Sequence, residues 1–371
     1  MEKTKVRTLI RQVRGVSYKP EDLHNELDDN SVILLRANNI DEGKINFDDV
    51  VYVDKSKVSD EQYLKDGDIL ICASSGSKNL VGKAASIRLN MECTFGAFCK
   101  VVRSKEGIEE YLGVYFQSPI YRRKISEVAI GANINNIRNE HIDELDIPVF
   151  SNDEQVSIAK RMHLIQEVIS NRKAELEKLD DLIKARFVEM FGDPILNPNG
   201  YLKEKIEKHI DLLSGYPFKS EQYVEEGINI CGGLIIMPQK IKWNECVHWS
   251  SAEGFEDYLL NENDIVMALD RPWISEGFKM AKVDAEHLPA LLIQRTARIR
   301  AIDMNQEYLY NCFINGGFDK HSYVTGSLVP HISAKDIRSF EIMIPPAELQ
   351  NQFADFVHQV DKSKVVVASV K

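Results

Sequence analysis

The sequence predicts an α+β protein with two similar domains, separated by long coiled-coil spacer helices and related by a pseudo-twofold internal repeat. Three observations support this fold class. The chain repeats itself at an interval of 195 residues, strand-like runs mix with turn residues in both halves, and a heptad pattern follows each half. The length of 371 residues also fits two domains, since one domain usually takes about 100–200 residues.

The repeat extends over a whole domain and the helix that follows it. Residues 131–162 align with residues 326–357 without a gap. The apolar positions keep their register, as in Ile134/Val329, Val149/Ile344, Ile158/Phe353 and Met162/Val357. The period is far longer than that of a solenoid, whose repeats take about 20–50 residues. A duplicated domain with a helical spacer is typical of a protein that reads two copies of something at a fixed distance.

We assign residues 1–151 to the first domain and 193–346 to the second. In both, apolar and β-branched runs alternate with Gly, Asn, Asp and Ser, which indicates short strands joined by turns. The strands predicted in the first domain are Val32–Leu35, Val50–Val53, Ile69–Cys72, Phe98–Val102 and Asp146–Phe150, with a helix at Glu109–Phe116. Those in the second are Ile228–Cys231, Ile265–Ala268, Ile293–Ile302 and Phe340–Ile344, with a helix near Glu307–Ile314.

A central spacer helix is predicted at residues 152–192. Asn152 or Asp153 can cap its start, and Gly192-Asp193-Pro194 closes it. Its seam positions recur at spacings of four and three, which is the pattern of a coiled coil. They are Ile158, Met162, Ile165, Ile169, Arg172, Leu176, Leu179 and Ile183, all apolar except Arg172. A distal spacer at residues 347–371, short or truncated beside the first copy, carries the matching positions Phe353, Val357 and Val360. An internal pair of such helices can pack antiparallel.

Composition narrows the class of protein. A net charge of −11 argues against coating nucleic acid by charge alone, so DNA binding would need local basic patches or a partner that supplies positive charge. No apolar run approaches the roughly 18 residues that cross a membrane, and the first residues lack the apolar core of a signal peptide. A cytoplasmic location is therefore expected. The six cysteines show no C-x-x-C pair and are expected to be buried, reduced thiols.

The search for catalytic motifs points away from an enzyme. Residues 76–84 resemble a phosphate-binding loop, but one residue too many separates the glycines, and Ala84 replaces the Ser or Thr that holds magnesium. The sequence has no G-x-S-x-G elbow, no N/D-P-P-Y/F/W-type loop and no metal-binding arrangement of histidines. We therefore expect a non-catalytic chain without a metal or cofactor of its own.

The remaining polar loops are candidate DNA contacts, because Arg and Asn suit base edges while Ser and Lys suit phosphates. The candidates in the first domain are Tyr18, Lys19, Arg36, Asn38, Ser74, Ser75, Ser77, Lys78, Arg122, Arg123, Asn133 and Asn135. Those in the second are Phe218, Lys219, Arg271, Trp273, Lys279, Thr325, Ser327 and His331. The loops differ between the copies while the strands agree, which favours one scaffold that reads two sequences. The alternative for each loop is an ordinary turn.

Motifs at both ends of each domain carry a resemblance to a known family. The domains open on Gly15-Val-Ser-Tyr18-Lys19 and Gly215-Tyr-Pro-Phe218-Lys219. The first closes on Ile147-Pro148, then Glu154-Gln155 and, after the spacer, Phe191-Gly-Asp-Pro194. In this order and with this duplication, the chain resembles the specificity subunit of type I restriction–modification systems. The second copy departs from the pattern, with Pro345-Pro346 in its closing element and Leu349 where the first copy has Glu154.

The resemblance implies a DNA-recognition subunit. Each target recognition domain would read one half of a bipartite site in double-stranded DNA, and the helices would set the gap and dock two modification (adenine methyltransferase) subunits. A restriction motor–nuclease subunit would join them, and S-adenosylmethionine, ATP and Mg²⁺ would belong to these partners. The alternative function is a coiled-coil scaffold whose globular ends bind proteins. Exchange of the first domain would change a methylation motif only if the domain reads DNA.

Overall fold

The computed structural model describes residues 2–41, 43–76, 80–88, 91–105, 107–131, 136–321 and 331–369. The chain divides into two compact units, Met1–Ser170 and Asn171–Lys371. The helix α5 (Asn152–Phe191) belongs in part to each. Within the described ranges, no helix has both the length and the apolar character that crossing a membrane requires.

Two four-stranded sheets form the framework of the first unit, with the strand orders β10-β4-β7-β3 and β2-β11-β8-β9. The strands of the first sheet are Leu23–His24 (β3), Ser31–Leu35 (β4), Val51–Asp54 (β7) and Cys93–Phe95 (β10). Those of the second sheet are Ile10–Arg14 (β2), Ile69–Cys72 (β8), Ala84–Ser86 (β9) and Cys99–Ser104 (β11). Two short ladders add β1 (Lys3–Lys5) with β12 (Asp146–Pro148), and β5 (Ile40–Asp41) with β6 (Lys44–Ile45).

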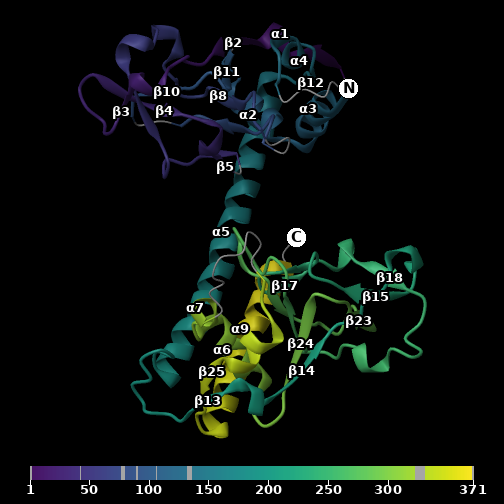
Figure 1. Cartoon of the computed structure of the whole chain (residues 1–371). Helices are drawn as coiled ribbons and strands as arrows, with labels where there is room; N and C mark the ends of the chain where they lie inside the picture. Colours follow the sequence, from purple (N-terminus) through teal and green to yellow (C-terminus); the bar gives the residue numbers. More distant parts are fainter. Residues whose placement is uncertain are drawn as a thin grey trace. The chain divides into compact units, whose positions relative to one another are not determined.

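The strand β8 shows why its sequence is a continuous apolar run. Alternate residues of a strand face opposite sides of the sheet, and both sides of β8 are covered. Ile69 and Ile71 pack in a core with the helices, whereas Leu70 and Cys72 pack in a second core against the other sheet. The helices are α1 (Val6–Leu9), α2 (Glu109–Gln117), α3 (Pro119–Gly131) and α4 (Asn139–Asp143). The second sheet therefore lies between a helical layer and the first sheet (Figure 1).

The second unit repeats this framework. Its four-stranded sheet has the order β14-β24-β19-β22, which corresponds to β2-β11-β8-β9, and its three-stranded sheet β18-β15-β23 corresponds to β7-β4-β10. These strands are Ile210–Ser214 (β14), Ile228–Cys231 (β15), Val247–Trp249 (β18), Ile265–Ala268 (β19), Met280–Lys282 (β22), Ala290–Leu292 (β23) and Thr296–Ala301 (β24). The pairs β4–β10 and β15–β23 are both parallel. The predicted internal repeat and α+β class are thus confirmed.

Short ladders and helices complete the second unit. The ladders are β13 (Lys203–Lys205) with β25 (Glu341–Met343), β16 (Ile236–Met237) with β17 (Lys240–Ile241), and β20 (Trp273–Ile274) with β21 (Gly277–Phe278). The helices are α6 (Gln306–Asn315), α7 (Phe318–His321), α8 (Ala334–Ser339) and α9 (Ala347–Ser369). Asn305 caps α6 by accepting hydrogen bonds from the backbone N–H groups of Glu307 and Tyr308, as an N-cap residue does.

The last part of α5 packs antiparallel to α9 (Figure 1). The ring of Phe353 lies 5.5 Å from the rings of both Phe187 and Phe191. Further along α9, Lys364 Nζ lies 2.7 Å from Asp180 Oδ1. Residue numbers rise along one helix as they fall along the other, so the antiparallel pair predicted from the heptads is confirmed in this unit. The apolar run at the end of α9 stays helical to Ser369.

The predicted seam is only partly buried. Ile183, Phe353, Val357 and Val360 are core residues, and Leu179 packs against them. Ile158 packs against the core of the first unit, Leu176 is half-buried, and Met162, Ile165 and Ile169 are exposed in this chain. The buried row continues from Ile183 to Phe187 and Phe191 instead of following the heptad, because a straight helix that packs on a globular core drifts from a 3.5-residue repeat.

Candidate nucleic-acid interface

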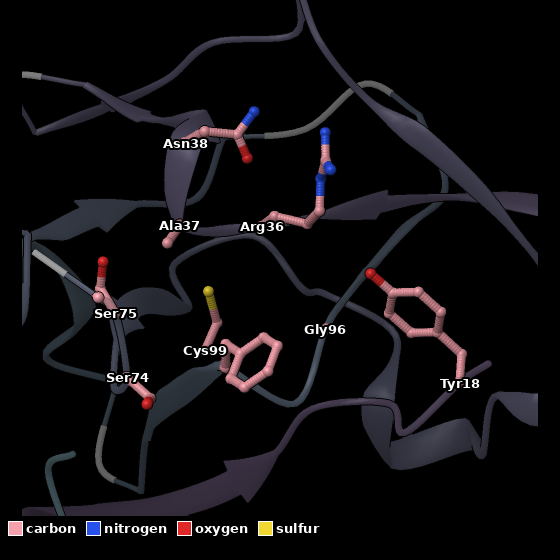
Figure 2. A pocket seen from close by; sticks show the side chains of 10 residues that line it. Tyr18, Arg36, Ala37, Asn38, Ser74, Ser75, Gly96 and Cys99 are labelled. Atoms are coloured by element: carbon pink, nitrogen blue, oxygen red, sulfur yellow. The ribbon is translucent and has the colours of Figure 1, made fainter. Parts of the chain in front are cut away.

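A pocket in the first unit brings together five of the predicted contact residues: Tyr18, Arg36, Asn38, Ser74 and Ser75. Figure 2 shows them around one space together with Ala37, Gly96 and Cys99. The residues come from three segments, namely the chain after β2, the turn after β4 and the turn after β8. Beside the pocket two backbone segments lie very close, since a side chain at Gly15 would overlap the carbonyl oxygen of Gly96. The second unit has the same close approach, between Gly215 and the carbonyl oxygen of Ile293.

Arg36 and Asn38 are held in place by one carboxylate. Arg36 Nη2 and Asn38 Nδ2 donate to Asp49 Oδ2 at 3.0 and 2.7 Å. The backbone N–H of Arg36 also donates to Asn39 Oδ1 at 2.8 Å, which fixes the turn. Because Asp49 offsets the charge of Arg36, this edge of the pocket presents oriented hydrogen-bond donors with little net charge. Such an edge suits base edges better than phosphates.

Phe98 lines the same pocket and was not among the predicted contacts. Its side chain is 71% exposed, at the turn between β10 and β11. The backbone N–H groups of Ala73 and Ser74 donate to its carbonyl oxygen at 2.9 and 3.0 Å. The sequence places Phe98 at the start of a predicted strand, where an aromatic residue indicates a core position. In the structure the strand begins one residue later, at Cys99, and Phe98 is exposed to solvent.

The second unit has the same frame with other side chains on it. Asp270 pairs with His331 in an isolated bridge, as Ser74 pairs with Asn136 in the first unit. Asp270 Oδ1 lies 2.6 Å from His331 Nδ1, and Asp270 Oδ2 lies 3.2 Å from Arg295 Nη1. Arg271 is exposed and has a φ of +46°, a backbone conformation that non-glycine residues seldom adopt.

The comparisons with known proteins agree with this duplicated architecture. A model of the type I restriction modification DNA specificity domain matches residues 19–180 and again residues 215–366. The chain belongs to this family. The two matched segments begin just after β2 and β14, cover the rest of each copy of the framework, and include most of the spacer helices α5 and α9.

Two curated members of the family illustrate the likeness. The chain is 41% identical over 180 residues to the type I restriction enzyme StySPI specificity subunit of Salmonella potsdam, which is 48% of this chain and 39% of that protein. It is 39% identical over 201 residues to the EcoKI specificity subunit of Escherichia coli K12, which is 54% of this chain and 43% of that one. The chain thus spans less than half the length of these relatives.

A solved structure shows the shared fold. The S subunit of a type I restriction-modification system from M. genitalium superposes with a TM-score of 0.53 at 14% identity, and the match covers 99% of this chain and 91% of that one. At this identity the likeness concerns the fold. It supports the family's arrangement of two similar domains with long helices.

Three predicted contacts in the second domain have structural roles. Phe218 is buried, with its ring 4.7 Å from that of Trp249 and 5.1 Å from that of Phe255, so we correct its predicted DNA contact to a packing role. Lys279 is also buried, its ammonium donates to the carbonyl oxygen of Gly233, and burial lowers its pKa. The ring of Trp273 stacks on Phe278 at 5.2 Å and packs against the core.

Of the remaining predicted contacts, four lie in the described part of the chain and outside the pocket of Figure 2. Arg122 Nη1 donates to the carbonyl oxygen of Val81 at 2.6 Å and lines a different pocket from that of Figure 2. Arg123, Lys19 and Lys219 are exposed, and their DNA contacts stay predictions. Ser77, Lys78, Asn133, Asn135, Thr325 and Ser327 lie outside the described residues.

Metal and thiol chemistry can be assessed for the described part of the chain. There, no group of three or more His, Cys, Asp or Glu side chains is placed to hold a metal ion. All six cysteines are free, and all but Cys246 are buried. Burial raises the pKa of the Cys72 thiol to about 11 and that of Cys312 to about 12. Such thiols are poor nucleophiles at neutral pH, because the thiolate is the reactive form.

Proposed function

We propose that this chain is the non-catalytic DNA-recognition subunit of a type I restriction–modification complex. Each domain reads one half of a bipartite target in double-stranded DNA, and the spacer helices set the gap between the halves. The observation that carries this function is a framework kept in both copies while the exposed side chains on its turns differ. A scaffold of this kind can present two different sets of hydrogen-bonding groups to two different sequences.

The charge of the chain assigns part of the binding to its partners. Specific DNA binding takes much of its affinity from phosphate contacts made by Lys and Arg, yet this chain carries a net charge of −11. The pocket of Figure 2 also has its arginine offset by Asp49. We infer that the modification subunits supply most of the phosphate contacts. S-adenosylmethionine, ATP and Mg²⁺ belong to the modification and restriction subunits in this proposal.

The first part of α5 supports a docking role for the spacer. Large apolar side chains face solvent there, in the row Met162, Leu164, Ile165, Val168 and Ile169. An exposed apolar row of this length on a helix is typical of a protein–protein interface. We propose that modification subunits dock on this row, and that a restriction motor–nuclease subunit joins the complex through them.

A methylation map tests the function directly. The chain is produced together with its modification subunits in a host that lacks adenine methylation, and methylated adenines are mapped over the genome. The expected result is one bipartite motif with a constant gap, which disappears when this chain is left out. An assembled complex that methylates no defined sequence would contradict the proposal.

A domain exchange separates this function from that of a protein-binding scaffold. Residues 1–151 are replaced by the equivalent domain of a relative with another target, and the spacer is kept. If the domain reads DNA, one half of the motif changes while the other half and the gap stay the same. A scaffold with protein-binding ends would leave the motif of the complex unaltered.

A further inference from the structure

Hydrogen bonds of the backbone establish which positions of the two domains are equivalent. The N–H of Ala73 donates to the carbonyl oxygen of Phe98 at 2.9 Å, and the N–H of Leu269 donates to that of Arg295 at the same distance. The N–H of Gly96 donates to Leu35, and that of Ile293 donates to Cys231, at 2.9 and 3.2 Å. Phe98 therefore corresponds to Arg295, and the turn that starts at Arg36 corresponds to the turn that starts at Gly232.

At these equivalent positions, apolar and polar side chains have changed places. In the first domain Arg36, Asn38 and Phe98 all line the pocket. In the second domain the turn carries Gly232 and Leu234, and the guanidinium stands at Arg295 instead. Leu234 is 90% exposed. At these two positions, each domain thus presents an arginine from one segment and a large exposed apolar side chain from the other.

Arg295 stands in an unusual conformation for its residue type. Its φ is +63°, in the left-handed region that favours glycine, and its side chain is 73% exposed. A non-glycine residue held in this region costs on the order of 1–3 kcal/mol, and such residues cluster at functional sites. Packing does not account for an exposed arginine at this turn. Arg295 occupies the position that corresponds to Phe98, which lines the pocket of Figure 2.

Asp270 fixes the direction of this guanidinium. One carboxylate oxygen lies 3.2 Å from Arg295 Nη1, and the other lies 2.6 Å from Nδ1 of His331. The carboxylate therefore contacts both the His331 ring and Nη1 of Arg295. A guanidinium has five N–H donors. The donors that this ion pair does not use can hydrogen-bond to a base.

We propose that Arg295 reads a guanine in the half-site of the second domain, that Asp270 positions it, and that Phe98 makes the equivalent contact in the first domain as an apolar one. This inference rests on the proposed DNA-recognition function. Bidentate donation to O6 and N7 of guanine is the base contact that arginine makes best, and an exposed aromatic edge suits the methyl group of thymine.

The test uses the complete complex and the methylation map. Arg295→Ala is expected to make one guanine position of one half-site degenerate, with discrimination against other bases falling about tenfold to a hundredfold. Arg295→Lys is expected to retain part of this discrimination, because lysine keeps a charged donor but cannot bind bidentately. Asp270→Asn is expected to relax the same position to a smaller extent. Phe98→Ala is expected to change only the other half-site.

Controls separate the possible failures. Arg338→Ala removes another exposed arginine of the same unit, one that lies 3.9 Å from Glu207, and is expected to leave the motif unchanged. Arg295→Gly removes the guanidinium and suits a φ of +63°, so it tests recognition without backbone strain. An unchanged motif in both Arg295→Ala and Arg295→Gly overturns the inference, as does a uniform loss of methylation over all sites. A wild-type complex without any motif overturns the proposed function instead.

Discussion

At the residue scale, the repeated glycine at the start of each domain has a steric cause. Gly15 lies against Gly96 in the turn between β10 and β11, and Gly215 lies against Ile293 in the turn between β23 and β24, so a Cβ atom would overlap the carbonyl oxygens of those residues. The sequence shows that a glycine recurs here but gives no reason for it. The reason is a close approach of two backbone segments next to the candidate interface, and the same approach occurs in both copies.

This contact predicts a loss of stability for Gly15→Ala. Because the opposing group is backbone and cannot rotate away, we expect the free energy of unfolding to fall by about 1–3 kcal/mol, as in overpacked cores. Urea denaturation followed by far-UV circular dichroism measures the free energy of unfolding. Gly76→Ala is the matched control, since apart from its chain neighbours no atom of the described residues lies within 4 Å of the position that a Cβ at Gly76 would take. Equal stability of the two variants would refute the steric explanation.

A buried ion pair also recurs at equivalent positions. Arg103 binds Asp68 through Nε and Nη2, both at 2.6 Å, and Arg300 binds Asp264 through the same two atoms at 2.5 and 2.7 Å. In the first unit both partners are almost fully buried. Further donation to the carbonyl oxygens of Glu61 and Tyr63 ties the strand β11 to the segment before β8.

Removal of one partner is therefore expected to be costly. Asp68→Ala leaves the Arg103 guanidinium buried without its carboxylate, and we expect a loss of about 3–5 kcal/mol of stability. The exposed pair of Arg172 and Glu175 is the comparison, at a distance of 3.0 Å on the surface of α5. Glu175→Ala is expected to change stability by no more than about 1 kcal/mol. Thermal unfolding of both variants measures the difference, and similar losses would contradict the assignment.

At the element scale, the helix α5 has two parts with different surroundings. Near its end Phe187 and Phe191 are fully buried against Phe353 and Tyr308. In its first part Ile165 and Ile169 are exposed. The heptad pattern alone does not separate the two, because it records which residues are apolar and not what covers them.

This division predicts two different phenotypes on one helix. Phe187→Ala is expected to lower the stability of the chain by about 3–5 kcal/mol, the usual cost of emptying an aromatic core position. Ile165→Glu is expected to change stability by only about 0.5 kcal/mol, as surface substitutions do, and to weaken capture of the modification subunit. Denaturation and co-purification are measured on both variants. Normal assembly with Ile165→Glu would remove the proposed docking role from this row.

The sequence predicted elements well where both faces of a strand are buried. The runs at β8 and β19 are continuous and apolar because each strand contributes to two cores, and their predicted bounds match the structure. The strand predicted at Ile293–Ile302 starts too early, because Arg295 turns the chain between β23 and β24 with a positive φ, and the strand β24 begins at Thr296. The DNA contact predicted for Phe218 was wrong for a related reason, since the sequence of a loop motif does not show whether its aromatic residue is buried.

At the scale of the whole molecule, the distribution of charge decides how DNA is bound. The chain carries a net charge of −11, and two arginines at the candidate interface are paired with carboxylates, Arg36 with Asp49 and Arg295 with Asp270. These pairs suit base recognition more than phosphate neutralisation. We therefore expect the chain by itself to bind duplex DNA weakly, and the complex with modification subunits to bind it tightly.

The dependence of DNA affinity on salt concentration tests whether this chain makes mainly base contacts and its partners make the phosphate contacts. Each phosphate neutralised releases counterions, so a complex with 6–10 phosphate contacts loses about 10³–10⁵ in affinity between 50 and 200 mM salt. For the chain alone we expect a loss of about tenfold or less over the same range, since few phosphates are neutralised. Fluorescence anisotropy with a duplex that carries the mapped target measures both slopes. A duplex of scrambled sequence is the control, and it should reproduce the slope of the complex but not its affinity. Tight binding by the chain alone, with a steep dependence on salt, would show that its own Lys and Arg side chains contact the DNA phosphates. The phosphate contacts would then belong to this chain and not to its partners.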